Sequence, residues 1–213
     1  MKLTVHTFVT LDGVMQGPGG RDEDRSNGFE HGGWLVPYVD DDFGRIVTEW
    51  FGHADEILLG RSTYDMMRSF WTEVDDPADP VATALNGLPK NVVSRTLTDA
   101  SWHNSKVIAG DVVDSVTALK ARAGRELQVH GSWQLVRTLH DAGLVDEYRL
   151  LLFPVVLGSG KRLFADGAAT TGFTLVDSEV TSTGVTHQVL RPTAFGTGEI
   201  VVEEGREVLV QPE

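Results

Sequence analysis

Two short glycine-containing segments combine residue types that bind phosphate. The first is Leu58-Leu59-Gly60-Arg61-Ser62-Thr63-Tyr64, and the second is Val129-His130-Gly131-Ser132-Trp133-Gln134-Leu135. In each, apolar residues typical of a strand lead through a glycine and a hydroxyl residue into a helical pattern. The N-terminus of a helix presents free N–H groups and about half a positive charge, so it attracts phosphate. Two such turns at one sheet edge suit the two ends of a dinucleotide.

A purely structural role fits the same hydroxyl residues. Ser62 and Ser132 are suitable N-caps, each of which stabilises its helix by about 1 kcal/mol. Arg61 and Arg95 both follow predicted strands directly, where a forked guanidinium group suits a phosphate. The pair of turns together with these arginines favours nucleotide binding, and the capping alternative stays open.

Other signatures of catalysis or metal binding are missing. No GxGxxG follows a strand, and Gly158-Ser159-Gly160-Lys161 lacks the first glycine of a P-loop. There is no GxSxG elbow and no HExxH. The chain has no cysteine, and its seven histidines are scattered. We therefore expect no metal site.

The hydrophobic pattern predicts the elements that position these turns. Strands are expected over residues 3–11, 56–59, 91–94, 106–109 and 126–130. Helices are expected to begin near Asp40, Gly60, Asp111 and Gly131. Beyond residue 147 the pattern is β-like, with strands at 148–157, 173–180 and 185–190 and a hairpin at 200–210. The expected fold is α/β, with a mostly parallel central sheet, helices on both faces and antiparallel C-terminal strands.

Composition limits the class of protein. A chain of 213 residues with 41% hydrophobic residues can form one domain, which we place at 1–192, followed by a β-hairpin extension at 193–213. The net charge of −13 and the absence of a basic cluster disfavour nucleic acid and anionic membranes as partners. There is no apolar run long enough to span a bilayer and no secretory signal pattern, so we expect a cytoplasmic protein.

Five motifs, in order along residues 1 to about 190, resemble one family. They are Thr10-Leu11-Asp12-Gly13, Gly60-Arg61-Ser62-Thr63-Tyr64, Val93-Ser94-Arg95, His130-Gly131-Ser132, and the run from Phe153 to Gly160. The chain resembles the dihydrofolate reductase-like family, and more closely its branch containing the reductase domain of bifunctional riboflavin-biosynthesis proteins (the RibD C-terminal domain). Ser132 and Trp133 depart from that pattern, because smaller residues are usual there.

The resemblance implies an NADPH-binding enzyme that is commonly a homodimer. It implies that the pyrophosphate and adenosine side is held by Gly60, Arg61, Ser62 and Thr63, and that the 2′-phosphate is met by Ser94 and Arg95. It places six residues under the pyrophosphate and the nicotinamide ribose: His130, Gly131, Ser132, Trp133, Gln134 and Leu135. It places four residues beside the nicotinamide: Asp12, Gly13, Val14 and Met15.

The substrate end is predicted from fewer residues. Trp34 and Phe153 are expected to border the substrate, although Trp34 also fits a loop anchor and Phe153 a bulge. Asp12 and Asp40 are the candidate sources of the proton that must accompany hydride transfer. Asp12 equally fits a turn former, and Asp40 equally fits a helix cap.

Together these observations predict a reductase that uses NADPH to transfer hydride to a C=N or C=O bond of a small pterin- or pyrimidine-like heterocycle. The acidic loop containing Asp22, Glu23, Asp24 and Glu30 is a poor receptor for a phosphorylated substrate, so we do not expect a strict riboflavin-pathway role. One alternative is a dimeric nucleotide-binding module without turnover. Another is a structural dimer in which both turns are only caps. The apolar C-terminal strands favour a homodimer in each case.

Overall fold

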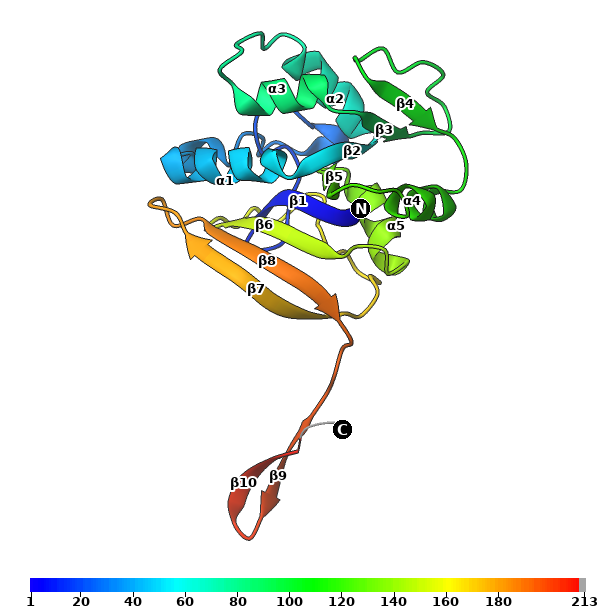
Figure 1. Ribbon diagram of the computed structural model, residues 1–213. Helices are drawn as coiled ribbons and strands as arrows, with labels where there is room; N and C mark the ends of the chain where they lie inside the picture. The colour runs from blue at the N-terminus through cyan, green and yellow to red at the C-terminus, as the bar shows by residue number, and fades with distance from the viewer. Residues whose placement is uncertain (211–213) are drawn as a thin grey trace.

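The computed structural model describes residues 1–210, which form an eight-stranded sheet and a separate two-stranded hairpin (Figure 1). The sheet order is β4-β3-β2-β5-β1-β6-β8-β7. The strands are β1 (Lys2–Thr10), β2 (Ala54–Gly60), β3 (Lys90–Val93), β4 (Ser105–Ile108), β5 (Glu126–His130), β6 (Glu147–Phe153), β7 (Gly172–Val180), β8 (Thr186–Thr193), β9 (Glu199–Glu203) and β10 (Arg206–Val210). The helices are α1 (Asp41–Gly52), α2 (Arg61–Trp71), α3 (Pro80–Gly87), α4 (Val112–Lys120) and α5 (Trp133–Asp141).

Strands β1 to β6 are parallel to one another, whereas β8 is antiparallel to both β6 and β7. Two hydrophobic clusters cover the two faces: α1, α2 and α3 contribute to one, and α4 and α5 to the other. The predicted fold class is therefore confirmed. None of the helices within residues 1–210 is long and apolar enough to cross a membrane.

Helix α3 was not predicted, because its eight residues are too few to show a periodic pattern. The residues at its start nevertheless favour a helix that begins there. Pro80 occupies the first turn, and the Asp79 carboxylate accepts hydrogen bonds from the backbone N–H groups of Val81 and Ala82. Ala82 and Leu85 are the residues that it buries.

Asp12 joins the end of β1 to the segment that follows β6. Its carboxylate accepts hydrogen bonds from the hydroxyl of Thr10 (2.6 Å) and from the N–H groups of Leu157 (3.2 Å) and Gly158 (2.8 Å). Arg162 donates to the Asp12 carbonyl at 2.8 Å. Burial alone raises the pKa of Asp12, but the bonds from Thr10, Gly158 and Leu157 outweigh it and lower the pKa to about 2.

The C-terminal hairpin of β9 and β10 extends away from the body of the molecule (Figure 1). Glu204 and Gly205 form its two-residue turn with φ values of 49° and 76°, as in the type I′ turn that matches strand twist. The hairpin was predicted at this place. Residues 211–213 of the predicted extension lie outside the described residues.

We expect Asp12→Asn to lower the free energy of unfolding at pH 7 by about 1–2 kcal/mol, because the single amide oxygen is uncharged and cannot accept all the bonds that the two carboxylate oxygens accept from Thr10, Leu157 and Gly158. The folded pKa of about 2 lies below the unfolded value of about 3.9. The stabilisation is therefore complete above about pH 5 and is lost as the pH falls toward 2. Urea unfolding of the unmutated protein and of Asp12→Asn at several pH values tests this expectation. Equal free energies of unfolding at pH 7 would contradict it.

Candidate active site

A cleft of 540 Å³ opens at the carboxyl ends of the central strands. Its walls come from β1 (His6 to Phe8), the start of α2, the turn between β5 and α5, and the loop of residues 15–27. Strand β1 pairs with β5 only as far as His6, but with β6 as far as Thr10. The backbone of β1 beyond His6 is thus not paired on the β5 side, where Thr7 and Phe8 line the cleft. The cleft lies where open α/β sheets bind ligands.

The two glycine-containing turns are joined to each other. The Gly60 N–H donates to the Ser132 hydroxyl at 2.9 Å, and the Ser132 N–H donates to the Thr63 hydroxyl at 3.1 Å. Gly131 and Ser132 have φ values of 54° and 55°, and a Cβ on Gly131 would lie 3.3 Å from the Thr63 methyl group. The N-termini of α2 and α5 are consequently fixed side by side.

Neither serine side chain makes a capping bond to its helix, which corrects the structural alternative for these two residues. The N-cap of α2 is Gly60, and Ser62 is already the second residue of that helix. Ser132 occupies the N-cap position of α5, but its side chain makes no capping bond. It donates instead to the His130 carbonyl and accepts from Gly60.

The structure brings more than half of the predicted cofactor residues to the cleft. Eight of them line the cleft: Met15, Ser62, Thr63, His130, Gly131, Ser132, Trp133 and Gln134. Gly13, Val14, Gly60 and Leu135 do not line it; Val14 and Leu135 are buried and Gly13 and Gly60 partly so. Lys161 lies over the Trp133 ring at 6.0 Å.

The predicted 2′-phosphate residues lie together outside the cleft. Arg61 donates to the Thr96 hydroxyl at 2.5 Å, which places its guanidinium group beside the turn after β3. In that turn the Ser94 hydroxyl accepts hydrogen bonds from the N–H groups of Thr96 and Leu97. Arg95 is exposed. Ser94 therefore orders the loop, while both guanidinium groups reach solvent at its surface.

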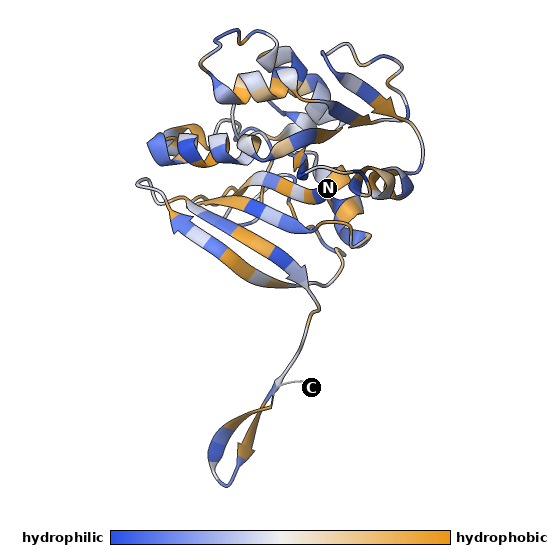
Figure 2. Ribbon diagram, viewed as in Figure 1, coloured by the Kyte–Doolittle hydropathy of each residue, from blue (hydrophilic) through white to orange (hydrophobic). Residues whose placement is uncertain are grey.

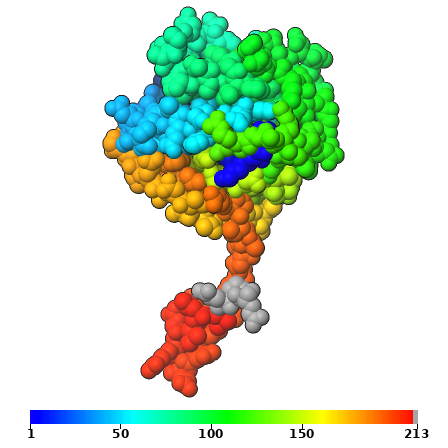
Figure 3. Space-filling model, in the orientation of Figure 1, coloured from blue at the N-terminus to red at the C-terminus, as the bar shows by residue number. Residues whose placement is uncertain are grey.

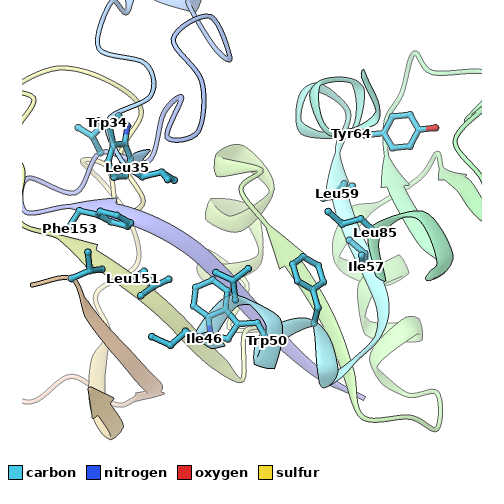
Figure 4. Packing of buried hydrophobic residues seen from close by; sticks show 14 of the residues in the cluster. Trp34, Leu35, Ile46, Trp50, Ile57, Leu59, Tyr64, Leu85, Leu151 and Phe153 are labelled. Atoms are coloured by element: carbon cyan, nitrogen blue, oxygen red, sulfur yellow. The ribbon is translucent and has the colours of Figure 1, made fainter. Parts of the chain in front are cut away.

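The two residues predicted to contact substrate belong to the core, which corrects that expectation. Phe153 is fully buried, and Trp34 is 7% exposed and packs edge-on against it at 5.2 Å (Figure 4). The Trp34 indole N–H donates to the Gln16 carbonyl at 2.8 Å. Neither ring lines the cleft. Trp34 anchors the loop that contains Gln16, as the alternative reading for this residue anticipated.

Asp40 and Asp12 are not placed to supply a proton, and this is a second correction. Asp40 caps α1 through the Phe43 N–H and also accepts bonds from Ser182 and Thr183 in the turn between β7 and β8. The bond from Phe43, with those from Ser182 and Thr183, lowers the pKa of Asp40 to about 2. Asp12 has a similar pKa and lies outside the cleft lining. Both are ionised carboxylates with structural roles at neutral pH.

The carboxylates that do line the cleft are Glu23 and Asp24. Asp24 accepts a hydrogen bond from Lys161 at 2.5 Å and another from the Ser26 hydroxyl, and despite burial these bonds lower its pKa. Glu23 accepts bonds from the N–H groups of Gly19 (2.6 Å) and Gly20 (2.9 Å). Burial nevertheless raises the pKa of Glu23 above its ordinary value. The sequence marked both residues only as members of an acidic loop.

Two buried histidines form a polar floor on β1 and β5. The rings of His6 and His130 stack at 5.1 Å, and Phe51 stacks on His130 at 4.6 Å. Burial lowers the pKa of His130 to about 3 and also lowers that of His6, so both imidazoles are neutral at pH 7. His6 Nδ1 is buried and makes no hydrogen bond within residues 1–210. No local pattern singled out His6, because only pairing with β5 brings it beside His130.

The described residues contain no group of acidic or histidine side chains that could hold a metal ion. The observations above instead fit a nucleotide cofactor. Gly131 lacks a side chain where one would crowd Thr63, and two helix N-termini face the same cleft.

Comparison with known proteins gives the family. The model of the RibD C-terminal domain matches residues 1–187. The uncharacterized protein YyaP of Bacillus subtilis (strain 168) is 30% identical over 187 residues, which is 86% of this chain and 91% of YyaP.

Solved structures share the fold at lower identity. A putative riboflavin biosynthesis protein from Shewanella sp. PV-4 is 24% identical with a TM-score of 0.65, over 91% of this chain and 99% of the other. Dihydrofolate reductase from Enterococcus faecalis, complexed with NADP(H), is 10% identical with a TM-score of 0.58, over 90% of this chain and 96% of the other. The chain therefore belongs to the RibD C-terminal domain family and has the dihydrofolate reductase-like fold.

Proposed function

We propose that this protein is an NADPH-dependent reductase that transfers hydride to a C=N or C=O bond of a small pterin- or pyrimidine-like heterocycle. The observation that carries the proposal is the connection between the two turns. Ser132 bonds to Gly60 and to Thr63, so the N-termini of α2 and α5 face one cleft together. Family membership supports the same reaction class.

The residues present fit NADPH. The first-turn N–H groups of α2 and α5 would bind the pyrophosphate, and Gly131 would allow its close approach. Arg61 and Arg95 would bind the 2′-phosphate beside Ser94. Met15 and Thr7 would border the nicotinamide in the cleft. When bound, NADPH supplies the hydride, and the protein supplies orientation and exclusion of water.

The charges in the cleft favour a substrate without phosphate. Among the described residues that line it, Lys161 is the one Lys or Arg. Its ammonium group already bonds to Asp24. Glu23 and Asp24 would repel an added phosphate. The neutral floor of His6, His130 and Thr7 suits an uncharged ring that offers hydrogen-bonding groups.

Glu23 is our candidate for the group that handles the proton. It lines the cleft, and burial raises the pKa of its carboxyl group, which increases the protonated fraction near neutral pH. The bonds from Gly19 and Gly20 fix its position within the loop of residues 15–27. A protonated Glu23, or a water that it orients, would deliver the proton to the reduced nitrogen or oxygen.

A panel of pterins, pyrimidines and small carbonyl compounds incubated with the protein and NADPH tests the reaction class. Loss of the absorbance of reduced nicotinamide with one compound class supports a reductase. Binding of NADPH without turnover across the panel favours the nucleotide-binding module instead. Absence of NADPH binding would contradict both.

We predict that NADPH binds more tightly than NADH and that Arg95→Ala removes most of this preference. One lost charged hydrogen bond, about 1.5–3 kcal/mol, corresponds to roughly 10- to 150-fold in affinity. Fluorescence titration with both cofactors measures it. Arg68→Ala is the matched control, because Arg68 is an exposed arginine on α2 that contacts Ser101. Equal affinity of the unmutated protein for the two cofactors would contradict the assignment.

We predict that Glu23→Gln lowers turnover about 100-fold while NADPH affinity stays nearly unchanged. Glutamine keeps an oxygen that can accept the bonds from Gly19 and Gly20, so the loop keeps its shape. Asp22→Asn is the control, since Asp22 pairs with Arg25 and is largely exposed. Turnover should also fall with rising pH in the unmutated enzyme and lose that dependence in the variant. Full activity of Glu23→Gln would mean that water or substrate supplies the proton.

A further inference from the structure

Three polar side chains share one face of β5. Polar and apolar residues are interspersed along the strands of the sheet (Figure 2), and on β5 Glu126, Gln128 and His130 occupy alternate positions of a strand that is buried throughout. Arg149 holds the Glu126 carboxylate with hydrogen bonds of 2.6 and 3.2 Å. The Gln128 amide nitrogen donates to the same carboxylate at 2.7 Å, and the Gln128 oxygen lies 3.1 Å from Nε2 of His130. A connected polar row therefore ends at the cleft.

The hydrogen bonds of Gln128 determine which nitrogen of His130 carries the proton. The Gln128 amide N–H groups face two acceptors, the Trp50 carbonyl at 2.6 Å and the Glu126 carboxylate. The reversed amide would set its oxygen against both acceptors, so its orientation is fixed. The Gln128 oxygen can only accept, and Nε2 of His130 must donate to it. Burial lowers the pKa of His130 to about 3, so the imidazole is neutral at pH 7 and its Nδ1 carries a lone pair without a proton.

The ring of His130 can meet a ligand only at its edge. Phe51 stacks on it at 4.6 Å and His6 at 5.1 Å. Figure 3 shows α1, which supplies Phe51, packed closely against its neighbours in the body. Within residues 1–210 the one hydrogen bond of the ring is that of Nε2, yet Nδ1 is not among the enclosed side-chain atoms that lack a partner there. Since His130 lines the cleft, its Nδ1 is open to the cleft.

His6 repeats this arrangement on β1. Its Nε2 lies 2.9 Å from the Thr4 hydroxyl and 4.0 Å from the Glu126 carboxylate, whose negative charge favours a proton on Nε2. Its Nδ1 is buried and has no hydrogen-bond partner within residues 1–210, which costs free energy. The indole N–H of Trp50, which also lines the cleft, already donates to His187 at 3.2 Å. The floor therefore offers acceptors rather than donors.

We propose that His130 is a specificity-determining residue whose Nδ1 accepts a hydrogen bond from a ring N–H or amino group of the substrate, and that Gln128 is the residue that positions it. The inference rests on the proposed reduction of a small heterocycle in this cleft. It narrows the substrate to rings with amide-type N–H or amino groups, as in pyrimidinediones and pterins, against rings that offer oxygen acceptors alone. The backbone of the turn that follows His130 stays available to the cofactor.

Matched probes test the polarity of the floor without turnover. A pteridinedione with two ring N–H groups and its dimethylated form, in which both are N–CH₃, are titrated against the protein by calorimetry. Uracil and dimethyluracil repeat the comparison with a smaller ring. We expect the N–H compound to bind roughly 5- to 150-fold more tightly in at least one pair, the range for leaving one buried polar group unpaired. Equal binding within both pairs, or binding by none of the four compounds, would overturn the proposal.

Variants of His130 separate recognition from packing. His130→Phe keeps a ring that can stack on Phe51 but lacks the acceptor, so it should bind both members of a pair equally. His130→Asn carries an oxygen near the Nδ1 position and should retain part of the preference for the N–H compound. His103→Phe is the control, because His103 is exposed and does not line the cleft. An undiminished preference in His130→Phe would overturn the assignment.

The ¹⁵N NMR spectrum of the histidine rings reports the tautomer in the unmutated protein. Nδ1 of His130 should have the chemical shift of a bare ring nitrogen and should respond to the N–H probe but not to its dimethylated form. A protonated Nδ1 in the free protein would contradict the proposal. Gln128→Met removes the acceptor for Nε2, so His130 should then show a mixture of tautomers, which a loss of packing alone does not produce.

The same spectra distinguish this inference from the proposed function. An Nδ1 that responds to NADPH and not to the probes would assign the nitrogen to the cofactor, which overturns the inference and supports the proposed function. Discrimination between the probes in a protein that neither binds nor oxidises NADPH would leave the recognition by His130 standing and contradict the proposed function alone.

Discussion

The hydrogen bonds of Ser132 determine the shape of the cleft. Its hydroxyl joins the end of β2 to the end of β5, and its backbone N–H joins α5 to α2 through Thr63. Because the left-handed backbone at Gly131 and Ser132 turns the serine away from its own helix, the hydroxyl is available for this contact. The N–H groups at the start of α5 are left for a ligand. The same few atoms thus fix the strand ends and orient both helix N-termini.

The order of elements was predictable because each strand and most helices carry a local signal. Asp40 and Asp111 cap their helices where expected, and the hairpin was readable from Glu203-Glu204-Gly205-Arg206 between two apolar runs. The part of the cleft formed by the starts of α2 and α5 was also predictable, since its residues follow directly after strands. These features depend on neighbours within a few positions along the chain.

The roles of the residues expected at the substrate end were less predictable because their contacts span long sequence separations. Trp34 and Phe153 are 119 positions apart, by their numbers, and their contact is visible only in the fold. Asp12 looked available for chemistry, but its partners at Leu157 and Gly158 are supplied by a distant segment. Glu23 gained its raised pKa from burial by the folded loop, which no local pattern reports. Aspartate and tryptophan at a loop therefore indicate function only weakly.

The loop of residues 15–27, which lines the cleft, is attached to the rest of the molecule partly by polar contacts. Gln16 bonds to the carbonyls of Asp24 and Ser26, and Lys161 bonds to Asp24 from the segment after β6. Buried apolar residues anchor both sides of the loop, Val14 and Met15 before it and Phe29 and Trp34 after it. A segment held in this way opens locally at a small fraction of the free energy that unfolds the whole sheet. Local opening of this loop consequently needs no rearrangement of the strands.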